Sequence, residues 1–204
     1  MSTSEKEVPE EARQEVAGAV RRALAKHGYA NLTTSQIAEE TEKSEAFLFY
    51  HYDTKDDLVS AFLEDSIGWL DTRLKLTTED LETPDERLRA LCDIMLAIDS
   101  PRAMQGINIA VMELLSHAPH KESLQEPLRV HQDYVRDRLA EEIRAGVEQG
   151  IYREDVDPES SASFLQMTLD GSTGSVLSLG MEDVGEDIRE EIHAYIDGLM
   201  VDKK

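Results

Sequence analysis

Hydrophobic residues recur along this chain at spacings of three and four, and no segment alternates hydrophobic and polar positions with the period of a strand. Such spacing places the apolar side chains on one face of a helix. Capping residues, prolines and glycines divide the pattern into about nine segments. The sequence therefore predicts an all-α fold of about nine helices.

The N-terminal quarter has the layout of a helix-turn-helix domain, a longer helix followed by two short ones. Gly28 suits the end of the first helix. Thr33 and Gln36 have the spacing of a capping box, and Ser44 can cap the next helix. We expect this domain to occupy residues 1–53. The predicted helices cover residues 10–27, 33–41, 45–50 and 54–77.

The remaining residues, 54–204, are expected to form a second helical domain. Three of its helix starts share one device, a capping residue followed by proline at the first helical position. Pro127 either begins or kinks a long helix. The three starts are Thr83–Pro84, Ser100–Pro101 and Asp157–Pro158, and the later helices are predicted over 123–149, 158–179 and 183–201.

The composition is strongly acidic, with a formal net charge of −22 and 40% hydrophobic residues. The hydrophobic content excludes a disordered acidic tail, and the charge argues against a generic nucleic-acid binder. However, residues 13–55 hold six basic and six acidic side chains, so the acidity lies in the remainder. Arginine also outnumbers lysine, which together with the acidity suggests a protein from a salt-accumulating, halophilic microbe.

Candidate chemistry is sparse. The single Cys92, set among apolar residues, excludes a disulfide framework and a cysteine zinc site, and we expect it to be buried. His117 and His120 are separated by Pro119, which breaks the helix that would align them on a metal. There is no phosphate loop, dinucleotide fingerprint or nucleophile motif, so we predict no enzyme and no cofactor. Without a signal peptide or a membrane span, a cytoplasmic protein is expected.

The helix-turn-helix segment resembles the TetR family of transcriptional regulators. The resemblance lies in the run TTSQIAEE from Thr33, then Ser44, then LFYHYDTKDDL from Leu48 to Leu58. It covers about 13–62 and is weaker at 150–158 and around Leu169–Gly171. It implies a homodimeric regulator, a repressor by the family's common mode, that binds a palindromic double-stranded DNA operator and is released by a small effector. The pocket candidates given below suggest that this effector is apolar or amphipathic. The alternative is a sensor of the same fold without sequence-specific DNA binding.

The resemblance also implies which residues contact DNA. Thr34 matches a phosphate contact at a helix N-terminus, and Ser35 a position that sometimes reaches a base. Tyr50 and His51 match phosphate contacts, whereas Tyr52 is expected in the core. The base-reading positions are Glu45, Ala46 and Phe47, and the full candidate set adds Thr33, Gln36, Ser44, Phe49 and Lys55.

Four departures from the family pattern affect this prediction. Glu42 replaces the usual turn glycine, which would cost about 1 kcal/mol if positive φ were required. Lys43 replaces the usual valine, and Phe49 replaces a tyrosine and cannot donate to a phosphate. Glu45 repels phosphate but can accept from cytosine N4. We therefore expect DNA binding with a flat or inverted dependence on salt.

The second domain supplies two further sets of candidates, for which packing within the chain is the alternative in each case. Residues 79–157 are expected to carry an effector pocket, and the last two helices a four-helix dimer seam. The pocket candidates are Trp69, Met95, Met104, Ile107, Met112, His117, Tyr134, Phe164 and Met167. The dimer candidates are Phe164, Thr168, Gly171, Ser175, Ile192, Tyr195, Ile196 and Leu199.

Overall fold

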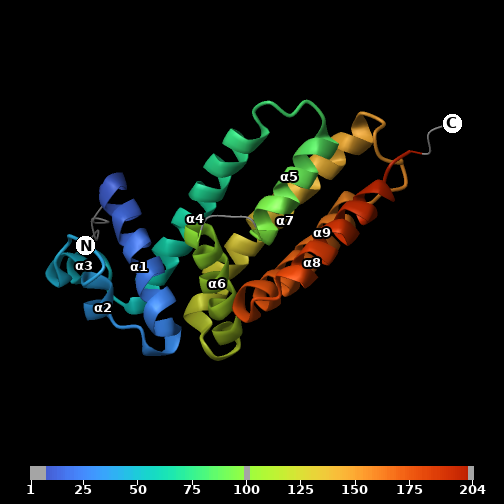
Figure 1. Cartoon of the computed structure of the whole chain (residues 1–204). Coiled ribbons are helices and arrows are strands. Elements are labelled where there is room, and N and C mark those ends of the chain that lie inside the picture. The colour runs from blue at the N-terminus through green and yellow to red at the C-terminus, as the bar shows by residue number, and fades with distance from the viewer. Residues whose placement is uncertain (1–7, 99–101, 202–204) are drawn as a thin grey trace. The chain divides into compact units, whose positions relative to one another are not determined.

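A computed structural model describes residues 8–98 and 102–201, which confirm the predicted all-α fold (Figure 1). Within these ranges the only extended pairing is a single antiparallel bridge between Tyr152 and Met200. A short 3-10 turn covers Ala118–His120. The helices are α1 (Glu10–Asn31), α2 (Thr34–Ala38), α3 (Glu45–His51), α4 (Lys55–Thr78), α5 (Pro84–Leu96), α6 (Arg102–His117), α7 (Glu122–Glu148), α8 (Pro158–Leu179) and α9 (Glu182–Asp197).

Most helix boundaries agree with the capping residues in the sequence. Thr83 and Asp157 cap α5 and α8 with proline at the first turn, whereas the expected Ser100–Pro101 start lies outside the described residues. Gly28 breaks α1 with a φ of 67°, and one more turn follows it. Pro127 lies inside α7, so it does not begin that helix. Helix α9 ends at Asp197, earlier than predicted, because the chain turns at Gly198 toward the bridge with Tyr152.

The described residues divide into two compact units. Unit 1 contains residues up to 69 together with 110–131, so the last part of α6 and the first part of α7 belong with α1 to α3. Helix α2 packs against both α1 and α3. Ile37 of α2 and Leu48 of α3 are fully buried. These units are defined by packing and have other bounds than the functional domains predicted to meet at residue 53, which stay a prediction.

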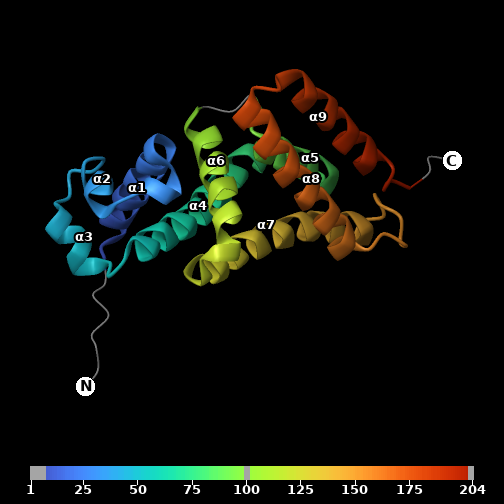
Figure 2. The ribbon, with the colours of Figure 1, turned by 90° about the horizontal axis from the view of Figure 1, so that it is seen from below.

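Unit 2 contains residues 70–109 and those from 132 onward. Helices α5, α8 and α9 pack on one another, and Figure 2 shows α8 and α9 side by side. Their core includes Leu88, Leu139, Leu165 and Ile196, all fully buried. Within the described ranges, no helix combines the length and the apolar character needed to cross a bilayer.

Candidate functional site

The two short helices of unit 1 are fixed at their N-termini by side chains that the sequence identifies. Thr33 and Gln36 form the predicted capping box of α2, and Ser44 Oγ accepts from the Phe47 N–H at 3.1 Å at the start of α3. Ser35 Oγ also donates to the Glu45 carboxylate at 2.5 Å, which joins the first turn of α2 to that of α3. The pair is therefore held as one reading head, residues 33–51.

One face of the reading head is open to solvent. Glu45 and Ala46 are exposed, and Phe49 and Tyr50 are 56% and 58% exposed. Phe47 is partly buried, its ring 4.5 Å from that of His51. Helix α3 therefore exposes two large aromatic side chains, Phe49 and Tyr50, within seven residues.

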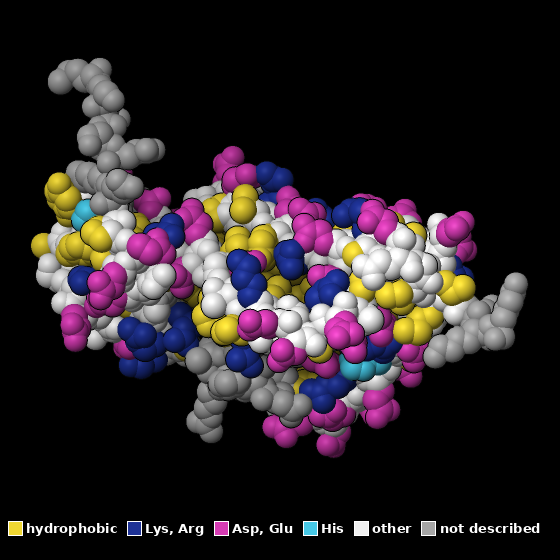
Figure 3. Space-filling model, turned by 90° about the horizontal axis from the view of Figure 1, so that it is seen from above, with side chains coloured by type: hydrophobic (Ala, Val, Ile, Leu, Met, Phe, Trp, Pro, Cys, Tyr) yellow, Lys and Arg dark blue, Asp and Glu magenta, His cyan; other side chains and the backbone are white. Residues whose placement is uncertain are grey.

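Basic side chains of the reading head and of the neighbouring α1 are engaged by acidic groups of the same unit. Lys26 pairs with Glu40 at 2.6 Å, and Lys43 with Glu15 at 2.9 Å. A hydrogen bond from Thr41, followed by one from Lys43, lowers the pKa of Glu15 to about 2. Figure 3 likewise shows acidic side chains spread over the visible face, with basic side chains among them. The head therefore does not present an unopposed basic surface of the kind that binds DNA through phosphate charge alone.

The turn between α2 and α3 does not require the positive φ that would make Glu42 costly in place of glycine. Ala97 is the only non-glycine residue with positive φ in the part of the chain that the structure describes. Glu42 thus adopts an ordinary backbone conformation, and the expected cost of replacing the glycine does not arise. The Glu15 carboxylate accepts from the Glu42 N–H at 3.0 Å and from Thr41 Oγ1 at 2.6 Å, which fixes this turn to α1.

Several predicted DNA contacts have other roles in this structure. Thr33, Gln36 and Ser44 are occupied in capping, although Thr33 and Ser44 remain exposed. Tyr52, expected in the core, is only half-buried, with its hydroxyl buried and without a hydrogen-bond partner among the described residues. The Lys55 ammonium group donates to the Tyr29 carbonyl at 3.0 Å and lies 4.4 Å from the centre of that ring, and its contact with DNA stays a prediction.

Tyr29 is the centre of a polar junction that the sequence did not reveal. It is buried, its N–H donates to Glu113 on α6 at 2.5 Å, and its hydroxyl donates to Asp56 on α4 at 2.6 Å. Asp56 also accepts from Ser123 on α7 at 2.5 Å and pairs with Lys121 at 3.5 Å. Burial raises the pKa of Asp56, but the bonds from Ser123, Tyr29 and Lys121 outweigh it, so the pKa lies below its usual value. These contacts form the Tyr29 junction.

Glycine is required at the neighbouring position of the junction. Gly28 has positive φ, and a Cβ built there would lie 2.8 Å from the Glu113 carboxylate. The sequence identified Gly28 only as the end of a helix. Its second role, the close approach of Glu113, depends on a residue far along the chain.

Unit 2 contains a polar row on the inner face of α8. Gln166 donates to the Gln132 carbonyl of α7 at 2.8 Å, and Thr173 donates to the Met95 carbonyl of α5 at 3.3 Å. Asp170 lies between them on the same face, one turn from each. Gln132 donates to the Asp170 carboxylate, but burial outweighs this bond and raises the pKa of Asp170 to about 6. No cation of the described residues pairs with Asp170.

A second under-partnered group, His131 of α7, belongs to unit 1. It is 8% exposed, and its Nδ1 is buried with no hydrogen-bond partner among the described residues. Burial lowers the pKa of His131 to about 4, so the ring is neutral at physiological pH.

The predicted pocket residues are distributed over both units. Trp69, Met112 and His117 belong to unit 1, where His117 packs 5.1 Å from the Tyr29 ring. In unit 2, Met95, Ile107 and Tyr134 are partly buried. Phe164 and Met167 are 51% and 61% exposed on the outer face of α8, so they do not line the interior of the unit. The Met104 side chain lies outside the described residues.

The predicted dimer residues also separate into two groups. Phe164, Gly171 and Ser175 are exposed along one side of α8, with Thr168 partly exposed between them. Ile192, Ile196 and Leu199 are buried in the core of their own chain, so they support α9 from beneath and do not form an outer face. Tyr195 packs 4.5 Å from Phe164 beside a groove of about 410 Å³ that also includes Ile188.

The described residues contain no cluster of three or more groups suited to hold a metal ion. Cys92 is buried as predicted, and burial raises the pKa of its thiol. It is therefore a core residue and not a reactive thiol.

Comparison with known protein families gives two matches that together span most of the chain. Residues 18–62 match the model of bacterial regulatory proteins of the tetR family. Residues 84–199 match the model of the C-terminal domain of BetI-type transcriptional repressors. The first match contains the reading head, and the second contains α5, α8 and α9.

Individual relatives agree with these matches. The HTH-type transcriptional repressor AcnR of Corynebacterium glutamicum is 23% identical over 84% of this chain and 85% of its own. A TetR transcription regulator from Haloarcula marismortui is 34% identical, with a TM-score of 0.77 over 93% of this chain and 98% of its own. A transcriptional regulator from Saccharomonospora viridis, solved in complex with choline, is 23% identical, with a TM-score of 0.77 over 96% of this chain and 100% of its own.

Proposed function

The chain belongs to the TetR family of bacterial transcriptional regulators, a family of transcription factors and not of enzymes. On that premise we propose that it is a repressor that binds a palindromic operator as a homodimer and is released by a small effector. The observation that carries the proposal is the reading head, in which two capped helices leave Glu45, Ala46, Phe49 and Tyr50 open to a DNA groove.

The chemistry of this face favours recognition of base edges over attraction to phosphates. Ala46 and Phe47 can contact thymine methyl groups, and Glu45 can accept from cytosine N4. Because Lys26, Lys43 and Lys55 are already engaged within unit 1, few counterions would be released on binding. Affinity should therefore fall much less with added salt than the slope of about −0.9 per phosphate contact expected of a basic head.

For the homodimer, we propose that the outer faces of α8 and α9 meet their counterparts in a second copy. The exposed Phe164 and Met167 and the small residues Gly171 and Ser175 form an apolar strip on which two helices can approach closely. The groove beside Tyr195 and Ile188 can receive a side chain of the partner. A two-fold arrangement of this kind uses the same patch on both copies.

For the effector, we propose a small amphipathic molecule with a positive charge. The half-buried Asp170 carboxylate has one amide donor, Gln132, and no cation among the described residues. A cationic ligand would supply the missing charge partner. The choline complex of the Saccharomonospora viridis relative makes choline a reasonable first probe.

The test is selection of a binding site from random duplex DNA, followed by footprinting at low and molar KCl. We expect protection of a palindrome. Ala46→Asp should abolish it because a carboxylate would face the phosphates, whereas Ala25→Asp, on an exposed site of α1, should bind as the native protein does. Absence of any selected palindrome, or equal binding by both variants, would contradict the proposal.

A second candidate function is a sensor of the same fold without sequence-specific DNA binding. The exposed acid Glu45 and the exposed Phe49, in place of residues that engage phosphates, favour it. Its signature would be binding of choline or a related cation, lost in Asp170→Asn, by a protein that selects no DNA sequence.

A further inference from the structure

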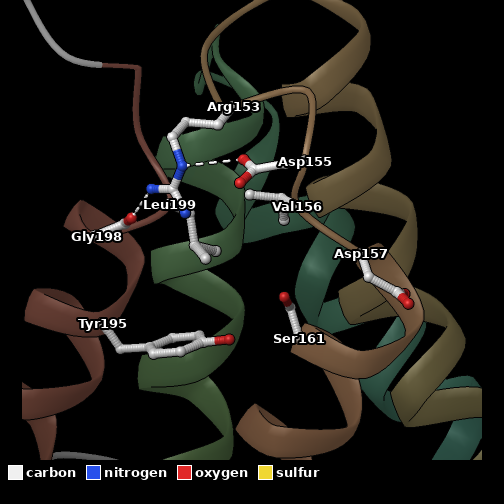
Figure 4. Close-up of a pocket in the computed structure, with 8 residues that line it drawn as sticks. All are labelled: Arg153, Asp155, Val156, Asp157, Ser161, Tyr195, Gly198 and Leu199. Atoms are coloured by element: carbon white, nitrogen blue, oxygen red, sulfur yellow. Dashed lines mark hydrogen bonds and ion pairs between the residues drawn. The ribbon is translucent and has the colours of Figure 1, made fainter.

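A pocket of about 400 Å³ lies in unit 2 where the segment after α7 meets the start of α8 and the end of α9 (Figure 4). It is distinct from the reading head and from the Asp170 row. Its lining residues are Arg153, Asp155, Val156, Asp157, Ser161, Tyr195, Gly198 and Leu199.

The walls of this pocket are held by the protein itself. The Arg153 N–H donates to the Leu199 carbonyl at 2.9 Å, and the Val201 N–H donates to the Ile151 carbonyl at 3.1 Å. The Arg153 guanidinium donates to Asp155 at 3.1 Å and also to the Gly198 carbonyl. A site fixed in this way loses little conformational freedom when a ligand enters.

Two hydroxyl groups in the pocket have no partner among the described residues. Ser161 is only 7% exposed, and no side-chain hydrogen bond is formed by its Oγ. The Tyr195 hydroxyl is likewise unbonded, and Figure 4 shows both groups directed into the space between α8 and α9. Both hydroxyl oxygens are reached by solvent, so they are free to bond to a polar molecule that enters the pocket.

The charge of the lining restricts what that occupant can be. Arg153 is opposed by Asp155, and the Asp157 carboxylate, also in the lining, accepts from the Ser160 N–H at 3.1 Å as the cap of α8. Neither an anion nor a cation would find an uncompensated opposite charge here. Val156, Leu199 and the Tyr195 ring provide apolar walls, and the volume is near the lower end of the range of about 300–1,000 Å³ for small-molecule sites.

We infer that this pocket binds a small neutral polyol or monosaccharide, with the Ser161 and Tyr195 hydroxyls bonding to ligand hydroxyls. The Arg153 guanidinium has five N–H groups, and those left over after Asp155 and Gly198 can donate to a ligand oxygen. The apolar face of the ligand lies against Leu199 and Val156. This inference does not rest on the proposed function, since it uses no residue of the reading head and only the hydroxyl of Tyr195, whose ring borders the groove of the proposed dimer face.

The test uses saturation-transfer NMR on the full chain with methyl α-D-glucopyranoside, glucosamine and glucuronate as neutral, cationic and anionic probes of similar ring size. We expect saturable binding of the neutral sugar and weaker binding of both charged ones. Ser161→Ala should weaken the neutral sugar about tenfold, the effect of losing one good hydrogen bond. Ser160→Ala is the matched control because Ser160 is exposed and does not line the pocket.

Tyr195→Phe provides a second variant that keeps the ring and removes only the hydroxyl, and it should weaken the sugar by a similar factor. The inference is overturned if none of the probes binds, if a charged probe binds best, or if Ser160→Ala and Ser161→Ala have the same effect. Thermal melts show whether each variant folds. Operator binding by Ser161→Ala, expected to be native, separates a failure here from a failure of the proposed function.

Discussion

The Tyr29 junction of unit 1 and the Asp170 row of unit 2 are both polar and largely buried, yet their hydrogen bonding differs. Tyr29 has its N–H, carbonyl and hydroxyl groups all bonded, to Glu113, Lys55 and Asp56. Asp170 has a single amide donor and no cationic partner among the described residues. The Tyr29 junction therefore stabilises the packing of its helices, whereas burial of the Asp170 carboxylate lowers the stability of the fold.

This difference matters because a buried polar group without partners is maintained against a free-energy cost. A satisfied network rigidifies its surroundings, so its removal should destabilise the fold. Removing an under-partnered group should be neutral or stabilising and should instead affect ligand binding. Substitutions in the two regions should therefore change stability in opposite directions.

Asp170→Asn should give the largest effect, a gain of up to about 3 kcal/mol in the free energy of unfolding at pH 8. The pKa of Asp170 is raised to about 6 in the fold. The native protein is therefore more stable at pH 4, where this carboxyl is protonated, and loses that stability as pH rises through 6 and the buried carboxyl ionises. Urea unfolding at pH 4 and pH 8 measures this, with the exposed Asp187→Asn as control. Equal stability of variant and native protein at pH 8 would contradict the assignment.

His131→Leu tests the same idea with the opposite pH dependence. Since burial lowers the pKa of His131 to about 4, the native protein should lose up to about 3 kcal/mol as pH falls from 6.5 to 4. The leucine variant should lose less over that interval, as followed by urea titrations at pH 7 and pH 4.5. Parallel losses in the two proteins would show that His131 does not resist protonation.

Tyr29→Phe should destabilise unit 1 by about 1–3 kcal/mol, because Asp56 loses a donor in a largely buried setting. Tyr195→Phe, which removes a hydroxyl with no partner among the described residues, is the matched control and should change stability little. Thermal unfolding of the two variants distinguishes them. If Tyr29→Phe were as stable as the native protein, the Tyr29 junction would not stabilise unit 1 and the two regions would not differ in this way.

A pair of serines offers a smaller test. Ser66 is buried and donates to the Leu63 carbonyl at 2.6 Å, whereas Ser161 is buried with an unbonded hydroxyl. Ser66→Ala should therefore destabilise the fold by about 1 kcal/mol, and Ser161→Ala should be neutral or slightly stabilising. Chemical denaturation of both variants at the same pH measures the difference.

The smallest expected effect concerns the whole surface. A net charge of −22 repels itself, and KCl screens that repulsion. If the acidic composition reflects a salt-rich cytoplasm, screening by KCl should stabilise the fold. Each kcal/mol of stabilisation raises the melting temperature of a chain of this size by about 2–4 °C, so we expect a rise of a few degrees between low and molar KCl. A melting temperature independent of KCl would leave the acidity without this explanation.

Local features of the fold were predictable from the sequence because each depends on residues close together along the chain. The Thr33–Gln36 capping box and the Thr83 and Asp157 helix starts are examples. The Tyr29 junction was not predictable, since it joins Tyr29 to Glu113 and Ser123, whose side chains meet only after folding.

The candidate sites show the same limitation. The spacing of Ile192 and Ile196 predicts that both lie on the apolar face of a helix, but not whether that face packs on its own chain or on a partner. The structure places both residues in the core of their own chain. Lys55 fits a DNA-contact pattern, yet a tyrosine carbonyl elsewhere in unit 1 engages its charge. The sequence does not predict that Ser161 and Tyr195 line one pocket, because only the fold brings them close together.

The composition of unit 1 also bears on engineering. Residues 110–131 belong to the same compact unit as the reading head. Within that unit Glu113 bonds to Tyr29 of α1, and Lys121 and Ser123 contact Asp56 of α4. A hybrid regulator made by grafting only the first 53 residues onto a foreign sensor would leave Tyr29 and its carboxylate acceptors in different proteins. Modular transfer of this head therefore requires a transplant with two separate chain segments, or a recipient that already carries matching acceptors.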